Sequence, residues 1–329
     1  MTPYPQYRIL SIDGGGIRGY IPALVLAEIE KRTGKRIAEM FDMIAGTSTG
    51  GILALGLTIP DANGKPKYSA EDLSNLYLEN GKTIFSRSTW QKIRSASGIA
   101  DEKYRQDGIE SILKDYFGEN NLSDTLIDVL ITSYDLETRK PLFFKSTKAK
   151  KDNNRNFKIW EAARATSAAP TYFEPLQLFT RNRAKQFGLV DGGVFANNPA
   201  MCAFAEATAM DKKDLLVVSL GTGETNKPYL YSEAKKWGLV QWIKPIISVM
   251  MDGNSDTVSY QLDQVLSANP KSNYYRLQTK LIEGSEEMDN AGKENMKLLK
   301  VVADDLITKN NATVGEICNN LMDTTPDIA

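Results

Sequence analysis

The sequence predicts an α/β fold of three layers, in which helices cover both faces of a mostly parallel central sheet. Short apolar segments typical of buried strands alternate along the chain with longer segments of helical periodicity. Three glycine-rich turns also follow predicted strands directly, as in α/β sheets that bind ligands at the ends of their strands. The chain has 329 residues, of which 42% are hydrophobic, so it is long enough to bury a large core.

The N-terminal elements contain two of these turns. A strand over residues 7–12 runs into Asp13-Gly14-Gly15-Gly16-Ile17-Arg18-Gly19, and a helix that ends before Gly34 follows. A second strand, over residues 42–45, runs into Gly46-Thr47-Ser48-Thr49-Gly50. The apolar residues after this turn predict a buried helix.

The rest of the chain continues the alternation of strands and helices. Further strands are predicted over residues 127–133, 142–145, 187–190, 215–220 and 274–278. Further helices are predicted over residues 69–78, 108–117, 159–166, 232–251, 255–268 and 290–308. One more helix is predicted to begin with Asn198 as N-cap and Pro199 as first helical residue. Residues 86–104 look irregular. We expect a single domain over residues 1–329, with a catalytic core over 7–202 and a largely helical part over 203–329 that completes the fold.

Composition excludes several functional classes. The formal net charge of −1 gives no reason to expect a nucleic-acid partner. Two cysteines, Cys202 and Cys318, cannot form a disulfide framework, which favours a reducing compartment. No signal-peptide pattern and no apolar run of bilayer length is present in the sequence. We therefore expect a cytoplasmic protein that contacts membranes only peripherally.

The turn around Ser48 has the G-x-S-x-G pattern of a nucleophile elbow, between Gly46 and Gly50. Glycine neighbours relieve crowding where a strained turn presents a serine side chain. The usual partner of such a serine is a histidine, and this chain contains none. Either Ser48 is not a nucleophile, or another group takes its proton.

The third turn, Asp191-Gly192-Gly193, supplies a carboxylate after a predicted strand. If the three strands are parallel, their turns converge at one edge of the sheet. Asp191 can then accept the Ser48 proton, and the backbone amides of Gly14, Gly15 and Gly16 can form an oxyanion hole. An aspartate with the ordinary pKa of about 3.9 is a weak base, so we expect burial to raise this pKa.

These residues resemble a known family. The turns Asp-Gly-Gly-Gly-x-Arg-Gly, Gly-Thr-Ser-Thr-Gly-Gly and Asp-Gly-Gly, in this order, resemble those of the patatin-like phospholipases, and residues 167–173, 219–223 and 234–238 are similar to plant patatins. The resemblance covers essentially the whole chain. It implies a fold related to the catalytic domain of cytosolic phospholipases A.

The resemblance also implies an activity. It points to a lipid acyl hydrolase of the phospholipase A or lysophospholipase type, which cleaves fatty-acyl esters of phospholipids or glycolipids with no metal or other cofactor. Ser48 corresponds to the nucleophile, Asp191 to its base, and Gly14 to Gly16 to the oxyanion loop. Arg18 stands where the family has a basic residue, near a substrate phosphate. An acyltransferase using the same acyl-enzyme is an alternative, and a regulatory partner or ligand is expected.

Two further alternatives concern the glycine turns. Gly14-x-Gly16-x-x-Gly19 also fits a dinucleotide-binding fingerprint, which needs an acidic residue at the end of the second strand. Asp42 begins that strand instead, so this interpretation is disfavoured. Asp191 alone is equally consistent with a turn residue that binds its own backbone, and only convergence with the other turns favours a catalytic role.

Residues 237–251 have two interpretations. Two tryptophans and flanking lysines are typical of a surface that docks on lipid. The segment is apolar nearly all round, however, which favours a core helix that packs on the sheet. The lysines and arginine between residues 145 and 158 are interpreted as a solvated loop rather than a headgroup site.

Overall fold

The computed structural model of the protein describes residues 6–85, 103–170, 172–225, 227–282 and 285–323. The irregular stretch predicted over residues 86–104 lies outside these ranges, except for its last residues, which begin helix α5 (Lys103–Phe117). Within the described ranges, no helix combines the length and the apolar character needed to cross a bilayer.

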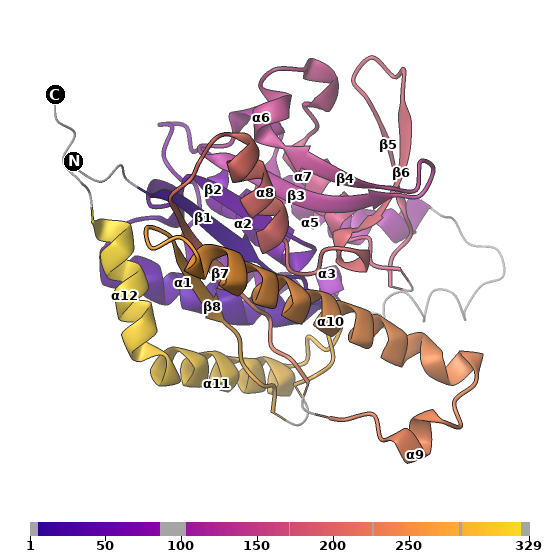
Figure 1. The fold of residues 1–329 in the computed structure, drawn as a ribbon. Coiled ribbons are helices and arrows are strands. Elements are labelled where there is room, and N and C mark those ends of the chain that lie inside the picture. Colours follow the sequence, from indigo (N-terminus) through magenta and orange to yellow (C-terminus); the bar gives the residue numbers. More distant parts are fainter. Residues whose placement is uncertain (1–5, 86–102, 171, 226, 283–284, 324–329) are drawn as a thin grey trace, which may run out of the picture.

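Eight strands form one sheet at the centre of the molecule (Figure 1). They are β1 (Tyr7–Ile12), β2 (Met43–Gly46), β3 (Asp128–Asp135), β4 (Lys140–Lys145), β5 (Leu176–Phe179), β6 (Gln186–Asp191), β7 (Leu215–Leu220) and β8 (Asn273–Leu277). The strand order is β5-β6-β3-β2-β1-β7-β8, and β4 pairs with β3. Every predicted strand is confirmed, and β5 is an additional strand that the sequence did not predict.

Helices surround this sheet. The longer ones are α1 (Tyr20–Thr33), α2 (Thr49–Thr58), α3 (Ala70–Phe85), α7 (Ile159–Thr166), α8 (Ala200–Ala209), α10 (Leu239–Ser267), α11 (Lys293–Lys309) and α12 (Asn311–Met322). Two single-turn helices are α6 (Ser146–Ala149) and α9 (Tyr231–Ala234), and short 3-10 helices η1 (Gly16–Gly19) and η5 (Gly192–Val194) follow β1 and β6. Helix α12 was not predicted from the sequence.

The centre of the sheet is parallel. Strand β1 pairs in parallel with β2 and β7, β2 pairs in parallel with β3, and β7 does so with β8. Strands β4, β5 and β6 are antiparallel to their neighbours. The prediction of a mostly parallel sheet is confirmed, but the assumption that all three glycine turns leave parallel strands is wrong for β6.

Strand β6 meets β2 end to end along one edge of β3. Leu130 and Ile131 pair with both β2 and β4, so these two strands lie on opposite edges of β3. Ser133 pairs with both β4 and Asp191 of β6, so β6 lies on the same edge as β2. Because β6 runs antiparallel to β2, its final residue Asp191 arrives opposite the turn after Gly46. The Ser48 and Asp191 turns therefore converge because their two strands point toward each other.

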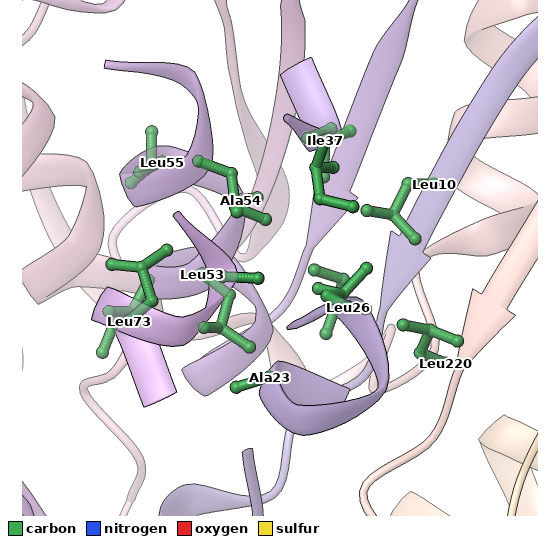
Figure 2. Packing of buried hydrophobic residues seen from close by; sticks show 14 of the residues in the cluster. Leu10, Ala23, Leu26, Ile37, Leu53, Ala54, Leu55, Leu73 and Leu220 are labelled. Carbon is green, nitrogen blue, oxygen red and sulfur yellow. The ribbon is translucent and has the colours of Figure 1, made fainter. Parts of the chain in front are cut away.

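Alternate residues of the central strands bury the two faces of the sheet. On one face, Leu10 and Ile12 pack with α1 and α2, and Figure 2 shows Leu10, Leu26 and Leu53 in this core. On the other face, Ile9 packs with Ala203 of α8 and Leu262 of α10. Strands buried on both faces are expected for a parallel sheet, and the predicted three layers are confirmed.

Several predicted helix boundaries differ from the structure. Residues 232–251 and 255–268 were predicted as separate helices, whereas α10 is continuous through Gly253 and Asn254. Tertiary contacts hold this stretch helical, since the Asn254 side-chain amide donates to the Phe195 carbonyl at 2.9 Å. Helix α8 begins at Ala200 with Pro199 as N-cap, one residue later than predicted, and the Asn198 side chain accepts a hydrogen bond from the Ala200 amide at 3.0 Å.

Candidate active site

Ser48 sits on a sharp turn between β2 and α2, as the sequence predicts. Its φ of 54° and ψ of −123° are strained for a residue with a side chain. A Cβ at Gly46 would overlap the Gly50 carbonyl, and a Cβ at Gly50 would overlap the Ile12 carbonyl. The glycines are therefore required because the backbone approaches itself too closely for any side chain.

Hydroxyl groups from three segments hold this turn in place. The Ser48 amide donates to Thr166 Oγ1 at 2.8 Å. The Thr47 hydroxyl donates to the Ala196 carbonyl at 2.6 Å and lies 2.7 Å from Thr132 Oγ1. The elbow is thus fixed to β3, to α7 and to the segment after Asp191. The sequence carried no signal for Thr132 or Thr166, because these contacts depend on tertiary approach.

Asp191 ends β6 beside Ser48, and both residues line the same cavity. Its carboxylate accepts a hydrogen bond from the Gly193 amide, whose nitrogen lies 2.7 Å from Oδ1, and the nearby Ser48 hydroxyl acts on the acidity of the carboxyl as a hydrogen-bonding group. A Cβ at Gly192 would overlap the Thr132 hydroxyl, so the second residue of this turn must be glycine. The structure therefore brings together the serine and the carboxylate that the sequence singled out.

The environment of Asp191 changes its acidity. Only 4% of the residue is exposed to solvent. Burial raises the pKa of the Asp191 carboxyl from 3.8 to about 7, while the hydrogen bonds from Ser48 and Gly193 act in the opposite direction. A carboxylate with this pKa is a far better proton acceptor near neutral pH than an ordinary aspartate.

The glycine loop after β1 offers two amides rather than three. The Gly14 amide donates to the Asn197 carbonyl at 3.0 Å, so its prediction as an oxyanion donor is wrong. Gly15 and Gly16 line the cavity, and their amides have no acceptor among the described residues. Gly16 has a φ of 59°, and a Cβ at Gly15 would overlap the Thr222 side chain. The loop is thus built from glycine because of close packing and backbone conformation.

Arg18 lies in a different place from the one the resemblance implied. Its side chain is buried, its Nε donates to the Gly15 carbonyl at 3.4 Å, and it does not line the cavity. Burial lowers the pKa of the guanidinium, while the charges of Asp252 and Glu286 raise it. Arg18 therefore contacts the backbone of the glycine loop, and its side chain is not placed to contact a substrate in the cavity.

The cavity beside Ser48 is mostly apolar and has a volume of about 190 Å³. Its apolar lining is Ala169, Pro170, Tyr172, Phe173, Val194, Ile247, Met250, Met251 and Met288. None of the described residues that line it is a lysine or an arginine. The sequence did not predict the contribution of α10 or of Met288, which lie far along the chain from the three glycine turns.

The structure gives no support to a dinucleotide site at the glycine loop. Asp42, the acidic residue nearest to the expected spacing, accepts a hydrogen bond from the Arg8 amide at 2.7 Å. Arg8 lies near the start of β1, so Asp42 is at the opposite end of the sheet from the glycine loop. No group of three or more potential metal ligands is found among the described residues.

Comparison with known proteins identifies the family. Residues 10–204 match the family model of the patatin-like phospholipases. The chain belongs to this family. The matched span contains all three glycine turns, and the resemblance read from them is confirmed.

Several patatin-like relatives match over nearly the whole chain. Patatin-like protein 2 of Oryza sativa subsp. indica is 34% identical over 343 residues, which cover 93% of this chain and 85% of the relative. "Probable inactive patatin-3-Kuras 1" of Solanum tuberosum is 34% identical over 330 residues, which cover 92% and 86%. Among solved structures, VipD from Legionella pneumophila aligns over 92% of this chain and 67% of its own, with 13% identity and a TM-score of 0.41.

Proposed function

We propose that the protein is a lipid acyl hydrolase in which Ser48 is the nucleophile and Asp191 is its base. The observation that carries the proposal is the pairing, in one cavity, of a strained serine with a buried carboxylate whose pKa is raised to about 7. Family membership supports the reaction class but does not by itself establish activity, since one relative bears the name "Probable inactive patatin". The Ser48–Asp191 pair is the feature that an active enzyme needs.

The first half of the proposed reaction forms an acyl-enzyme. Ser48 Oγ attacks the ester carbonyl carbon as its proton passes to the Asp191 carboxylate. The amides of Gly15 and Gly16 are positioned at the cavity to stabilise the negative oxygen of the tetrahedral intermediate. The carbon–oxygen bond to the alcohol then breaks, and Asp191 returns the proton to the departing alcohol oxygen.

The second half releases the fatty acid. A water molecule attacks the acyl carbonyl carbon while Asp191 takes one of its protons. The bond to Ser48 Oγ breaks, and the serine oxygen recovers the proton from Asp191. Transfer of the acyl group to another alcohol in place of water has the same steps, so the acceptor determines whether the enzyme is a hydrolase or an acyltransferase.

The cavity favours a substrate with an acyl chain. Its lining is apolar apart from the backbone of the glycine turns and the side chains of Ser48, Ser167 and Asp191, with the Tyr172 hydroxyl on an aromatic ring. An apolar pocket of this kind binds hydrocarbon by the hydrophobic effect. Because no lysine or arginine is among the described lining residues, we infer that the acyl chain enters the cavity and a headgroup stays outside it. The proposed substrates are fatty-acyl esters of phospholipids or glycolipids.

Release of fatty acid from a short-chain ester and from a phospholipid tests the dyad. We expect Ser48→Ala and Asp191→Asn each to lower kcat by about 10³-fold or more, because each removes one partner of the proton transfer. Matched controls are Ser74→Ala and Asp135→Asn, at buried residues of α3 and β3 outside the cavity. If Ser48→Ala retains full activity while circular dichroism shows native folding, the proposed mechanism is wrong.

A further inference from the structure

The N-terminal half of α10, together with α9, exposes large apolar side chains to solvent. In Figure 1 this part of the chain extends beyond the sheet, at the lower right. The exposed fraction is 90% for Leu239 and 78% for Val240, and it is 81% for Tyr231 of α9. We call the exposed apolar side chains of residues 229–250 the α9–α10 surface. The prediction of a core helix over residues 237–251 is wrong for this half.

Four apolar residues of this surface share one face of α10. Leu239, Trp242, Ile246 and Val249 follow one another at spacings of three and four residues, the period of a helical face. The C-terminal half of α10 packs differently, since Val258 and Leu262 are buried against the sheet. The exposed stripe therefore belongs to the half of α10 that leaves the sheet.

The α9–α10 surface is continuous with the candidate active site. Ile247, Met250 and Met251 of the same helical turns line the cavity beside Ser48. Met250 belongs to both, because it lines the cavity and is 53% exposed. An apolar molecule bound at the surface thus lies next to the cavity that holds the serine.

The polar groups around this surface indicate what covers it. Trp237 stacks edge-to-face with both Tyr229 and Trp242, at centroid distances of 5.3 and 5.1 Å. Residues 227–242 include three exposed lysines and one glutamate, and the Lys235 ammonium lies 5.7 Å from the Tyr231 ring centroid. Tryptophan, tyrosine and lysine next to an apolar face are typical of membrane-interface segments, whereas lysine is depleted in protein–protein interfaces.

We propose that the α9–α10 surface docks on phospholipid bilayers that contain anionic headgroups. The apolar stripe enters the headgroup and acyl boundary, the aromatic rings lie at the headgroup level, and the lysines contact anionic lipid. Docking then places the cavity mouth at the lipid surface, so an acyl chain passes from the bilayer to Ser48 without crossing water. The docking itself stands on the surface alone, and its catalytic consequence rests on the proposed hydrolase function.

Co-sedimentation with lipid vesicles tests the docking. The probes are vesicles of phosphatidylcholine alone and of phosphatidylcholine with about 30% phosphatidylserine, a mixture chosen to add negative surface charge. We expect the wild-type protein to bind the anionic vesicles more tightly, and the double variant Ile246→Asp/Val249→Asp to weaken this binding by about tenfold or more, since it introduces charge into the apolar stripe. The altered side chains are 46% and 49% exposed and do not line the cavity.

The double variant Val265→Asp/Val301→Asp is the matched control. It makes the same chemical change at side chains that are 45% and 51% exposed on other surfaces, and we expect vesicle binding to stay at the wild-type level. Equal binding by both double variants would overturn the proposal. A wild-type dimer that only the Ile246/Val249 variant dissociates would assign the surface to a second copy of the chain instead.

A soluble short-chain ester separates docking from catalysis. The Ile246/Val249 variant is expected to hydrolyse phospholipid vesicles at a rate about tenfold or more below that of the control variant. Both variants should cleave the soluble ester at similar rates. Vesicle binding without any ester hydrolysis by the wild type would refute the proposed function and leave the docking intact. Ester hydrolysis without vesicle binding would refute the docking and leave the proposed function intact.

Discussion

Burial gives Asp191 the acidity that a histidine would have in a more familiar serine hydrolase. The chain has no histidine, so the proposed reaction needs another acceptor for the proton of Ser48. A pKa of about 7 places the Asp191 carboxyl close to the ordinary range of histidine. The physical cause is loss of hydration at the end of β6, where no cationic neighbour among the described residues stabilises the charge of the side chain.

The activity is expected to depend on pH through this carboxyl. Only the ionised form of Asp191 can accept the Ser48 proton, so kcat/KM should rise as pH increases and reach half its maximum near pH 7. The measurement is hydrolysis of a soluble short-chain ester between pH 5 and pH 9. A midpoint near pH 4 would show that Asp191 titrates as an ordinary aspartate and is not made basic by burial.

The same raised pKa makes Asp191 costly for stability. The folded protein holds the proton more tightly than the unfolded chain, because the pKa rises from 3.8 to about 7 on folding. This residue's contribution to stability therefore falls as pH rises from about 4 to 7 and is constant above 7. We expect Asp191→Asn to be more stable than the wild type at pH 8. The difference in free energy of unfolding between the variant and the wild type should be roughly 2 to 3 kcal/mol larger at pH 8 than at pH 5. Urea denaturation at both pH values measures it, and an equal difference at the two would contradict it.

At the scale of elements, α10 joins the cavity to the segment that follows Asp191. The Asn254 side chain donates to the Phe195 carbonyl at 2.9 Å and accepts from the Asn198 amide at 3.4 Å. The next residue, Ser255, donates to Asp13 Oδ2 at 3.1 Å, beside the glycine loop. One turn of α10 thus supports both the Asp191 turn and the glycine loop whose amides we propose as the oxyanion hole.

Asn254 is therefore expected to act as a positioning residue. We expect Asn254→Ala to lower kcat on a soluble ester by about tenfold with little change in KM, because it loosens the Asp191 segment without touching the substrate. Gln261→Ala, an exposed side chain on the same helix, is the matched control. A change in KM alone would show that Asn254 acts on binding rather than on the geometry of the dyad. The midpoint of the pH profile should also move in the Asn254 variant and stay in place in the control.

The elements show where prediction from sequence succeeds. The elbow at Ser48 and the turn at Asp191 carry their glycines in the local sequence, because each turn is crowded by its own backbone or by a neighbouring strand. The direction of β6 was not predictable, since an apolar segment of this length has no signal for parallel or antiparallel pairing. The hydrogen bond from the Gly14 amide was equally unpredictable, because its acceptor, the Asn197 carbonyl, is far away in the chain.

Helix α10 shows a different limit of prediction. A helix segment that is apolar nearly all round is expected to be buried, and one face of the C-terminal half of α10 is buried against the sheet. The N-terminal half is exposed because it extends beyond the sheet, which depends on the position of the whole element and not on its own residues (Figure 1). The same apolar periodicity is therefore compatible with a core helix and with a helix that binds lipid.

At the scale of the whole molecule, the glycine turns depend on chain segments beyond residue 202. Strand β7 pairs with the entire length of β1, so the part over residues 7–202 has an open sheet edge without it. The Asp13 carboxylate, directly after β1, forms a bidentate ion pair with Arg276 of β8, with nitrogen–oxygen distances of 2.6 and 3.0 Å. We infer that the part over residues 203–329 completes the fold and anchors the glycine loop.

This ion pair is expected to be essential for stability. Asp13 is 1% exposed at its side chain, and although burial alone would lower the pKa of Arg276, the charge and hydrogen bonds of Asp13 raise it above the ordinary value. Arg276→Met leaves the Asp13 carboxylate buried without its partner, and we expect it to lower the free energy of unfolding by about 3–5 kcal/mol. The double variant Asp13→Asn/Arg276→Met removes the unpaired charge, so it should regain at least half of that loss. Urea denaturation of the three proteins measures both effects. Single and double variants of equal stability would show that Asp13 is not held as a charged group and that the glycine loop is anchored by its packing instead.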